Sequence, residues 1–173
     1  LWEGSNVAKR QTLVGPPERM RQVKDLITRG DEPNIVVLSA LSGTTNALVV
    51  IGEALAAADR LLAKSRIDEL NAHYLSFYPE LLKTESAREK AEAIIQEHFE
   101  FLNILLKISF NEAINRDILA QGELLSTKLF QTLLEELNIP SVFLIALDFM
   151  SIDENSEPEL SKISEKLTAI LAQ

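Results

Sequence analysis

Cysteine is absent from all 173 residues, so disulfide bonds, thiolate metal sites and cysteine nucleophiles are excluded. Glycine and proline are scarce in the middle of the chain, where Pro79 is the one such residue between Gly52 and Gly122. This scarcity predicts helices there. Apolar runs such as 35–38 and 47–51 are far shorter than the ~18 residues that span a bilayer. The N-terminus lacks an apolar signal segment and an initiator methionine, and we expect a cytoplasmic location.

Basic residues are fewer than acidic residues. The chain has 17 lysines and arginines against 26 acidic residues, a formal net charge of -9, which disfavours binding to nucleic acid. With 46% hydrophobic and 25% charged residues, the composition is that of a globular domain. We therefore expect one compact domain with no membrane or nucleic-acid partner.

Helical periodicity dominates the chain. Apolar spacing and end signals predict a helix from Pro16 to a stop at Gly30, a long helix capped by Thr84, and a last helix that begins at Pro158. Further helices are expected over about 45–64, up to residue 82 with a break near Pro79, and over 122–137.

Two short β-branched or apolar runs, 35–40 and 141–149, predict strands, and 5–14 is a possible third. Strands that alternate with helices indicate an α/β fold with a parallel sheet. Because so small a sheet cannot cover so much helix, the sequence is typical of part of a domain.

The segment "SALSGTTN", residues 39–46, joins the first predicted strand to a helix. Free amides at the helix N-terminus would favour a carboxylate or a phosphate, with the hydroxyls as further donors. The alternative is an ordinary turn, in which a hydroxyl caps the helix and Gly43 takes a positive φ. The segment lacks the Gly-Lys-Ser/Thr ending of a P-loop.

A second candidate lies in "AQGELLST", where Gly122 and Glu123 are predicted to begin a helix. Glu123 is either a first-turn residue stabilised by the helix dipole or a ligand for an amine. Neither His73 nor His98 has a second potential ligand at a spacing typical of metal sites, and we predict no metal site.

The segments "PERMRQVKDLI", "IVVLSALSGTTNALVVI", "AQGELLSTKLF" and "LDFM", in this order, resemble the N-terminal part of the kinase domain of aspartate kinases, in the amino-acid kinase family. The resemblance runs from about Val14 to the C-terminus, and the long helical middle resembles the lysine-sensitive or fused type. The resemblance implies that the fold is a three-layer α/β/α sandwich and that the protein is a cytoplasmic enzyme of lysine biosynthesis. Residues 1–173 would then form the N-terminal part of the kinase domain, without a regulatory domain.

The resemblance also implies a reaction, in which MgATP phosphorylates the β-carboxylate of L-aspartate. Ser39 and Thr45 match the residues that hold the substrate, and Glu123 matches the carboxylate that faces its α-amino group. Ser42 and Gly43 would lie on the nucleotide side of the same loop. No residue is assigned here as catalytic.

The chain departs from the family pattern where phosphate is bound. Residues 1–13 are atypical, because the family has Lys-Phe-Gly-Gly-Thr-Ser where this chain has residues 8–13. Lys9 is one position from the expected lysine, a shift that turns a strand side chain to the opposite face. Ser151 replaces a family arginine, and the family's Arg-Gly-Gly-Ser-Asp segment is not in the sequence.

These departures predict that the chain alone is inactive with MgATP. The alternative hypothesis is a degenerate paralogue or fragment that binds a small amino acid or a partner kinase chain. A homodimer, or completion of the site by another chain, is consistent with both hypotheses.

Overall fold

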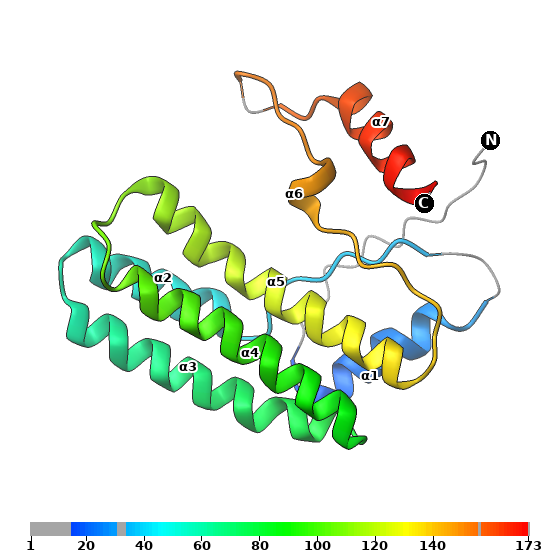
Figure 1. The fold of residues 1–173 in the computed structure, drawn as a ribbon, viewed down its shortest axis with the longest axis horizontal. Coiled ribbons are helices and arrows are strands. Elements are labelled where there is room, and N and C mark those ends of the chain that lie inside the picture. The colour runs from blue at the N-terminus through cyan, green and yellow to red at the C-terminus, as the bar shows by residue number, and fades with distance from the viewer. Residues whose placement is uncertain (1–14, 31–33, 156, 173) are drawn as a thin grey trace. The chain divides into compact units, whose positions relative to one another are not determined.

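The computed structural model describes residues 15–30, 34–155 and 157–172. The chain divides into two compact units, residues 1–140 and 141–173, which are described separately. The first unit contains the helices α1 (Pro17–Ile27), α2 (Thr44–Ala56), α3 (Arg60–Leu81), α4 (Glu85–Leu105) and α5 (Glu112–Glu136) (Figure 1).

Side-chain caps define where three of these helices begin. Asp59 accepts a hydrogen bond from the amide of Leu62 at 3.0 Å, and Asn111 accepts one from Ile114 at 2.9 Å. Thr84 caps α4 through the amide of Ala87 at 3.3 Å, as predicted. Each cap satisfies an amide that has no partner inside its helix, which fixes the helix start.

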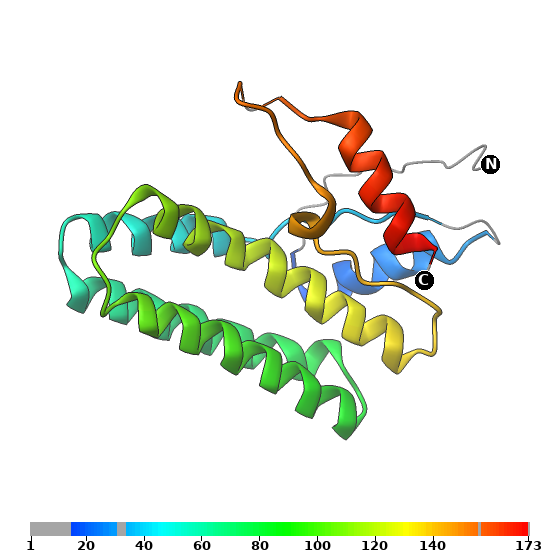
Figure 2. The same ribbon diagram turned by 45° about the horizontal axis from the view of Figure 1, so that its top comes forward.

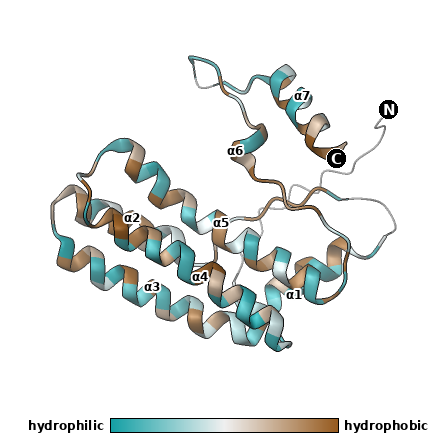
Figure 3. Ribbon diagram, in the orientation of Figure 1, coloured by the Kyte–Doolittle hydropathy of each residue, from teal (hydrophilic) through white to brown (hydrophobic). Residues whose placement is uncertain are grey.

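Helices α2, α3, α4 and α5 pack lengthwise into a bundle, with α1 against α3 (Figures 1 and 2). Hydrophobic and hydrophilic residues alternate along each helix with helical spacing (Figure 3). The inward stripe of α3 consists of Ile67, Leu70, Tyr74, Phe77 and Leu81, all buried. Every buried core residue that the structure describes belongs to this unit, so its folding rests on helix packing.

The predicted three-layer sandwich is wrong for the described residues, which contain helices and extended segments but no strand. Residues 35–40 have no regular secondary structure, and the predicted strand 141–149 ends in the short helix α6 (Ala146–Phe149). The possible strand 5–14 lies outside the described residues. β-branched composition favours extended backbone, but a sheet also needs a neighbouring strand to pair with.

Three predicted helix boundaries are also wrong. The helix expected over 45–64 is interrupted at 57–59, where Asp59 starts a new one. Pro79 does not break α3, which continues to Leu81, and Arg88 donates to the Pro79 carbonyl at 2.9 Å. The helix expected from residue 122 begins ten residues earlier, at Glu112 behind its Asn111 cap.

The second unit contains α6 and α7 (Leu160–Leu171), with an isolated antiparallel bridge between Ile152 and Pro158. None of its described residues is fully buried, although Ile163, Leu167 and Ile170 form a half-buried stripe on α7. Across both units, no described helix combines the length and the apolar character that crossing a membrane requires.

Candidate functional site

The N-terminus of α2 has no side-chain cap. Gly43 precedes the helix with φ of 83°, as the sequence predicted, but no hydroxyl caps the helix, so that part of the prediction is wrong. The amide of Thr44 donates to the Leu41 carbonyl at 3.0 Å. Within the described residues, the amides of Thr45 and Asn46 have no acceptor. These N–H groups at the positive end of the helix dipole are suited to an anion.

Ser39 and Thr45 lie on either side of this turn. Ser39 is half-buried and Thr45 is exposed, and neither hydroxyl hydrogen-bonds to a residue that the structure describes. The Ser39 carbonyl accepts a hydrogen bond from Ser126 Oγ of α5 at 2.8 Å, which joins the turn to the helix that carries Glu123.

Gly122 lets α5 approach the turn closely. A Cβ atom at Gly122 would lie 2.8 Å from the Cβ of Ala40 and 3.3 Å from Cγ2 of Thr44, so a larger residue would push the two elements apart. Glu123 follows it in the middle of α5, not in a first turn as predicted, and so gains no helix-terminal stabilisation. Its carboxylate is exposed and forms no ion pair with the described residues.

Tyr74 lies beneath the turn and was not singled out from the sequence. Its fully buried hydroxyl is 3.1 Å from Oγ1 of Thr44, the first residue of α2. Burial, and to a smaller extent the charge of Glu123, raise the pKa of Tyr74 to about 12, against the opposing effect of the Thr44 hydrogen bond. A tyrosine at a core position signals such a polar contact, because its buried hydroxyl needs a partner.

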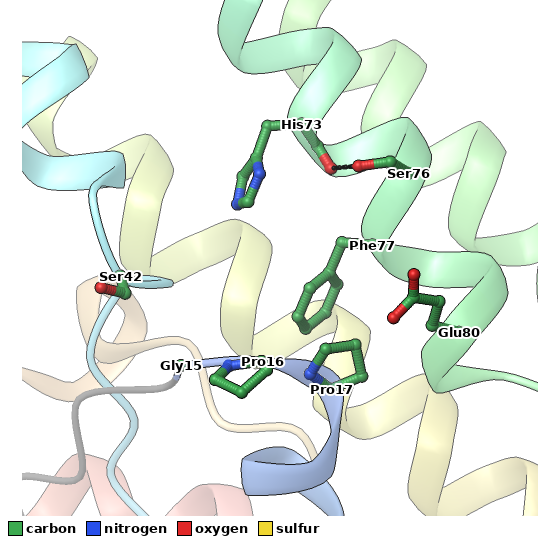
Figure 4. A pocket seen from close by; sticks show the side chains of 8 residues that line it. All are labelled: Gly15, Pro16, Pro17, Ser42, His73, Ser76, Phe77 and Glu80. Atoms are coloured by element: carbon green, nitrogen blue, oxygen red, sulfur yellow. Dashed lines mark hydrogen bonds between the residues drawn. The ribbon is translucent and has the colours of Figure 1, made fainter.

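An open pocket of about 450 Å³ adjoins the turn (Figure 4). Ser42 and His73 lie on opposite sides of it, and the rings of Phe77, Pro16 and Pro17 form its apolar side. Gly15, Ser76 and Glu80 complete the lining residues. The described lining residues include one carboxylate and no lysine or arginine, so their charge does not favour phosphate. Lys9, the other predicted phosphate contact, lies outside the described residues.

His98 and Asp153 are held by hydrogen bonds within the fold. His98 is buried between α4 and α5, and Asp153 accepts hydrogen bonds from the amides of Asn155 and Glu157 at 2.8 and 2.9 Å, which close a loop. Those bonds lower the pKa of Asp153. No group of three or more potential metal ligands occurs among the residues that the structure describes.

Comparisons with known proteins point to one enzyme class. No family model matches the chain. Lysine-sensitive aspartokinase 3 of Escherichia coli is 24% identical over 157 residues, which are 89% of this chain and 34% of that protein. Chloroplastic aspartokinase 2 of Arabidopsis thaliana is 37% identical over 131 residues, or 72% of this chain and 23% of that protein. The chain therefore spans about a third or less of the length of these relatives.

Solved structures of Escherichia coli aspartokinase III have a similar fold. The complex with lysine and aspartate matches 93% of this chain and 36% of that chain, with a TM-score of 0.75 and 22% identity. The complex with aspartate and ADP matches 90% of this chain and 35% of that chain, with a TM-score of 0.71 and 22% identity. At this identity the likeness is one of fold.

Proposed function

This chain is a homologue of the N-terminal part of aspartokinases, and on that premise we propose that it carries the amino-acid side of an aspartate-kinase site. Its ligand would be L-aspartate, whose β-carboxylate the complete site would phosphorylate with MgATP. The observation that carries the proposal is the close packing of Gly122 on Ala40 and Thr44, which brings the part of α5 that carries Glu123 against the uncapped N-terminus of α2.

Each charged group of a zwitterionic amino acid has a complementary group in this arrangement. A carboxylate would accept hydrogen bonds from the amides of Thr45 and Asn46 and from the hydroxyls of Ser39 and Thr45. The α-ammonium would pair with Glu123. Aspartate carries one ammonium and two carboxylates, so one carboxylate would be left facing the position of the phosphoryl donor.

ATP and Mg²⁺ are the expected co-substrates of the family, and phosphoryl transfer needs positive charge around the transferred group. The described groups at the turn are hydroxyls, amides and one carboxylate, and the described lining of the adjoining pocket contains no lysine or arginine. We therefore propose that this chain alone binds aspartate but does not sustain turnover. An ADP-release assay with L-aspartate and MgATP should show no continuing rate above buffer, and sustained turnover would overturn this part of the proposal.

Calorimetric titration with L-aspartate tests the binding proposal. Succinate, which lacks the ammonium, should bind more weakly than aspartate to the wild-type chain. Glu123→Gln should weaken aspartate binding by about tenfold, the usual cost of losing a charge-assisted contact, and should leave succinate binding unchanged.

Glu89→Gln is the matched control, because Glu89 is an exposed glutamate on α4. It should bind aspartate like the wild type. Absence of aspartate binding by the wild-type chain, or equal binding by the Glu123 variant, would contradict the proposal.

A second candidate function is association with another kinase chain. It is favoured by large apolar side chains of the second unit, because Val142, Leu147 and Leu160 are 70%, 79% and 75% exposed. Sedimentation velocity with a full-length aspartokinase should then show a single heavier species. Independent sedimentation of the two proteins at micromolar concentration would rule this function out.

A further inference from the structure

Thr44 and Tyr74 form a buried polar pair directly behind the candidate ligand site. Both side chains are fully buried, and their hydroxyls are 3.1 Å apart although they come from α2 and α3. Neither belongs to the set of residues that the family resemblance brings to the substrate. Neither can touch a ligand in solvent, so any effect on binding must act through the backbone of α2.

The first turn of α2 has few other restraints. It has no side-chain cap, and Gly43 before it has no side chain that could pack. The Thr44 amide is held by Leu41, while the next two amides are the ones left for a ligand. Among the described residues, Ser126 holds the Ser39 carbonyl ahead of this turn, and the contact from Tyr74 to Thr44 is the polar side-chain link to the first turn of α2 itself.

We propose that Tyr74 is a positioning residue, which holds the N-terminal turn of α2 through Thr44 so that the amides of Thr45 and Asn46 point at the ligand carboxylate. The inference rests on the proposed function for the identity of the ligand, L-aspartate. The positioning itself is a property of the unliganded chain. Because burial raises the pKa of Tyr74 to about 12, the hydroxyl stays protonated at neutral pH.

Tyr74→Phe tests the contact with little change in packing, because it removes one oxygen atom. Tyr78→Phe is the matched control, since Tyr78 is on the same helix and its hydroxyl makes an exposed contact with Glu92 at 3.3 Å. In amide NMR spectra of the unliganded chain, Tyr74→Phe should shift the signals of Thr45 and Asn46, and Tyr78→Phe should not. Unshifted Thr45 and Asn46 signals in Tyr74→Phe would overturn the inference whether or not aspartate binds.

Aspartate affinity gives the second readout. Tyr74→Phe and Thr44→Val should each weaken L-aspartate binding by about fivefold to tenfold, the range expected for one buried hydrogen bond. Thr44→Ser retains the hydroxyl and should bind like the wild type. Wild-type affinity in both Tyr74→Phe and Thr44→Val would overturn the inference, whereas failure of the wild-type chain to bind aspartate would overturn the proposed function.

The double variant separates positioning from stability. Each single variant leaves a buried hydroxyl without its partner, which destabilises the fold, and the Thr44→Val, Tyr74→Phe double variant removes both hydroxyls. Its thermal midpoint should therefore recover above that of Tyr74→Phe, while its aspartate affinity should stay as weak as in the single variants. Recovery of affinity together with stability would show that the pair has only a structural role.

Discussion

At the scale of single residues, His98 is a buried titratable group of the bundle with a defined hydrogen-bond partner. It is 5% exposed, and its Nδ1 is 2.5 Å from Oε1 of Gln121, whose Nε2 donates to the Asp117 carbonyl at 2.9 Å. Because that amide orientation makes Oε1 an acceptor, Nδ1 must carry the proton. Nε2 is then a buried acceptor without a donor among the described residues, so the ring is held neutral.

His98 should make the stability of the chain depend on pH. Burial lowers its pKa below 6.5, with a smaller contribution from Lys128, against opposing effects of Gln121 and Glu97. The unfolded chain therefore binds a proton that the folded chain does not. The free energy of unfolding should be fully retained above about pH 6.5 and should decrease as the pH falls toward the folded pKa. Urea unfolding between pH 5 and 8 measures this slope.

His98→Gln should flatten the slope, because it removes the titrating group. His73→Gln should leave it unchanged, since His73 is exposed. An equal slope in the wild type and in His98→Gln would assign the pH dependence to other groups.

At the scale of helices, α5 connects the site to the far end of the bundle. Its middle turns carry Gly122 and Glu123, and its last residue, Glu136, reaches the turn between α3 and α4. One oxygen of Glu136 accepts hydrogen bonds from the amides of Lys83 and Thr84, at 2.7 and 2.6 Å, and from the Thr84 hydroxyl at 2.9 Å. This carboxylate therefore joins three helices at one point.

Glu136→Gln should destabilise the chain by about 1 kcal/mol, a modest figure because the site is partly exposed to solvent. Burial raises the pKa of Glu136, but hydrogen bonds from Thr84 and Lys83 outweigh it, and the net shift is downward. Its contribution is therefore present above about pH 4.5 and is lost as the pH falls through the folded pKa. Thermal unfolding at pH 7 and pH 3 should show the variant less stable only at pH 7, and a difference that persists at pH 3 would contradict this account.

Helices were predictable because their signals are local. The cap at Thr84 and the apolar spacing after it predicted α4 correctly. Gly43 likewise predicted the positive φ before α2. Sheet pairing depends on partners far along the chain, and the predicted strands fail in the described residues for that reason. The start of α5 was missed because the sequence prediction began this helix at Gly122, whereas the helix begins at Glu112. In the structure Gly122 is required for close packing inside the helix.

At the scale of the whole molecule, the two units differ in how much surface they bury. All described buried residues belong to residues 1–140, whereas 141–173 has none. Because none of the described side chains in this 33-residue segment is buried, hydrophobic burial within it does not offset its conformational entropy.

Residues 1–140 should therefore fold without the second unit. Their thermal midpoint, followed by far-UV circular dichroism, should lie within about 5 °C of that of the whole chain, because the core is unchanged. A peptide of residues 141–173 should be largely unfolded, since a 12-residue helix is marginal in isolation. A loss of cooperative unfolding in residues 1–140 would show that the second unit is needed for the fold.

The hydrogen bond from Ser126 to the Ser39 carbonyl bridges 87 positions of the sequence. Helical hairpins such as α3 and α4 close short loops and form quickly, whereas a contact of this separation has to wait for a long loop to close. The turn and Glu123 should thus be joined late in folding. A newly made chain would acquire its helices first and the proposed ligand site last.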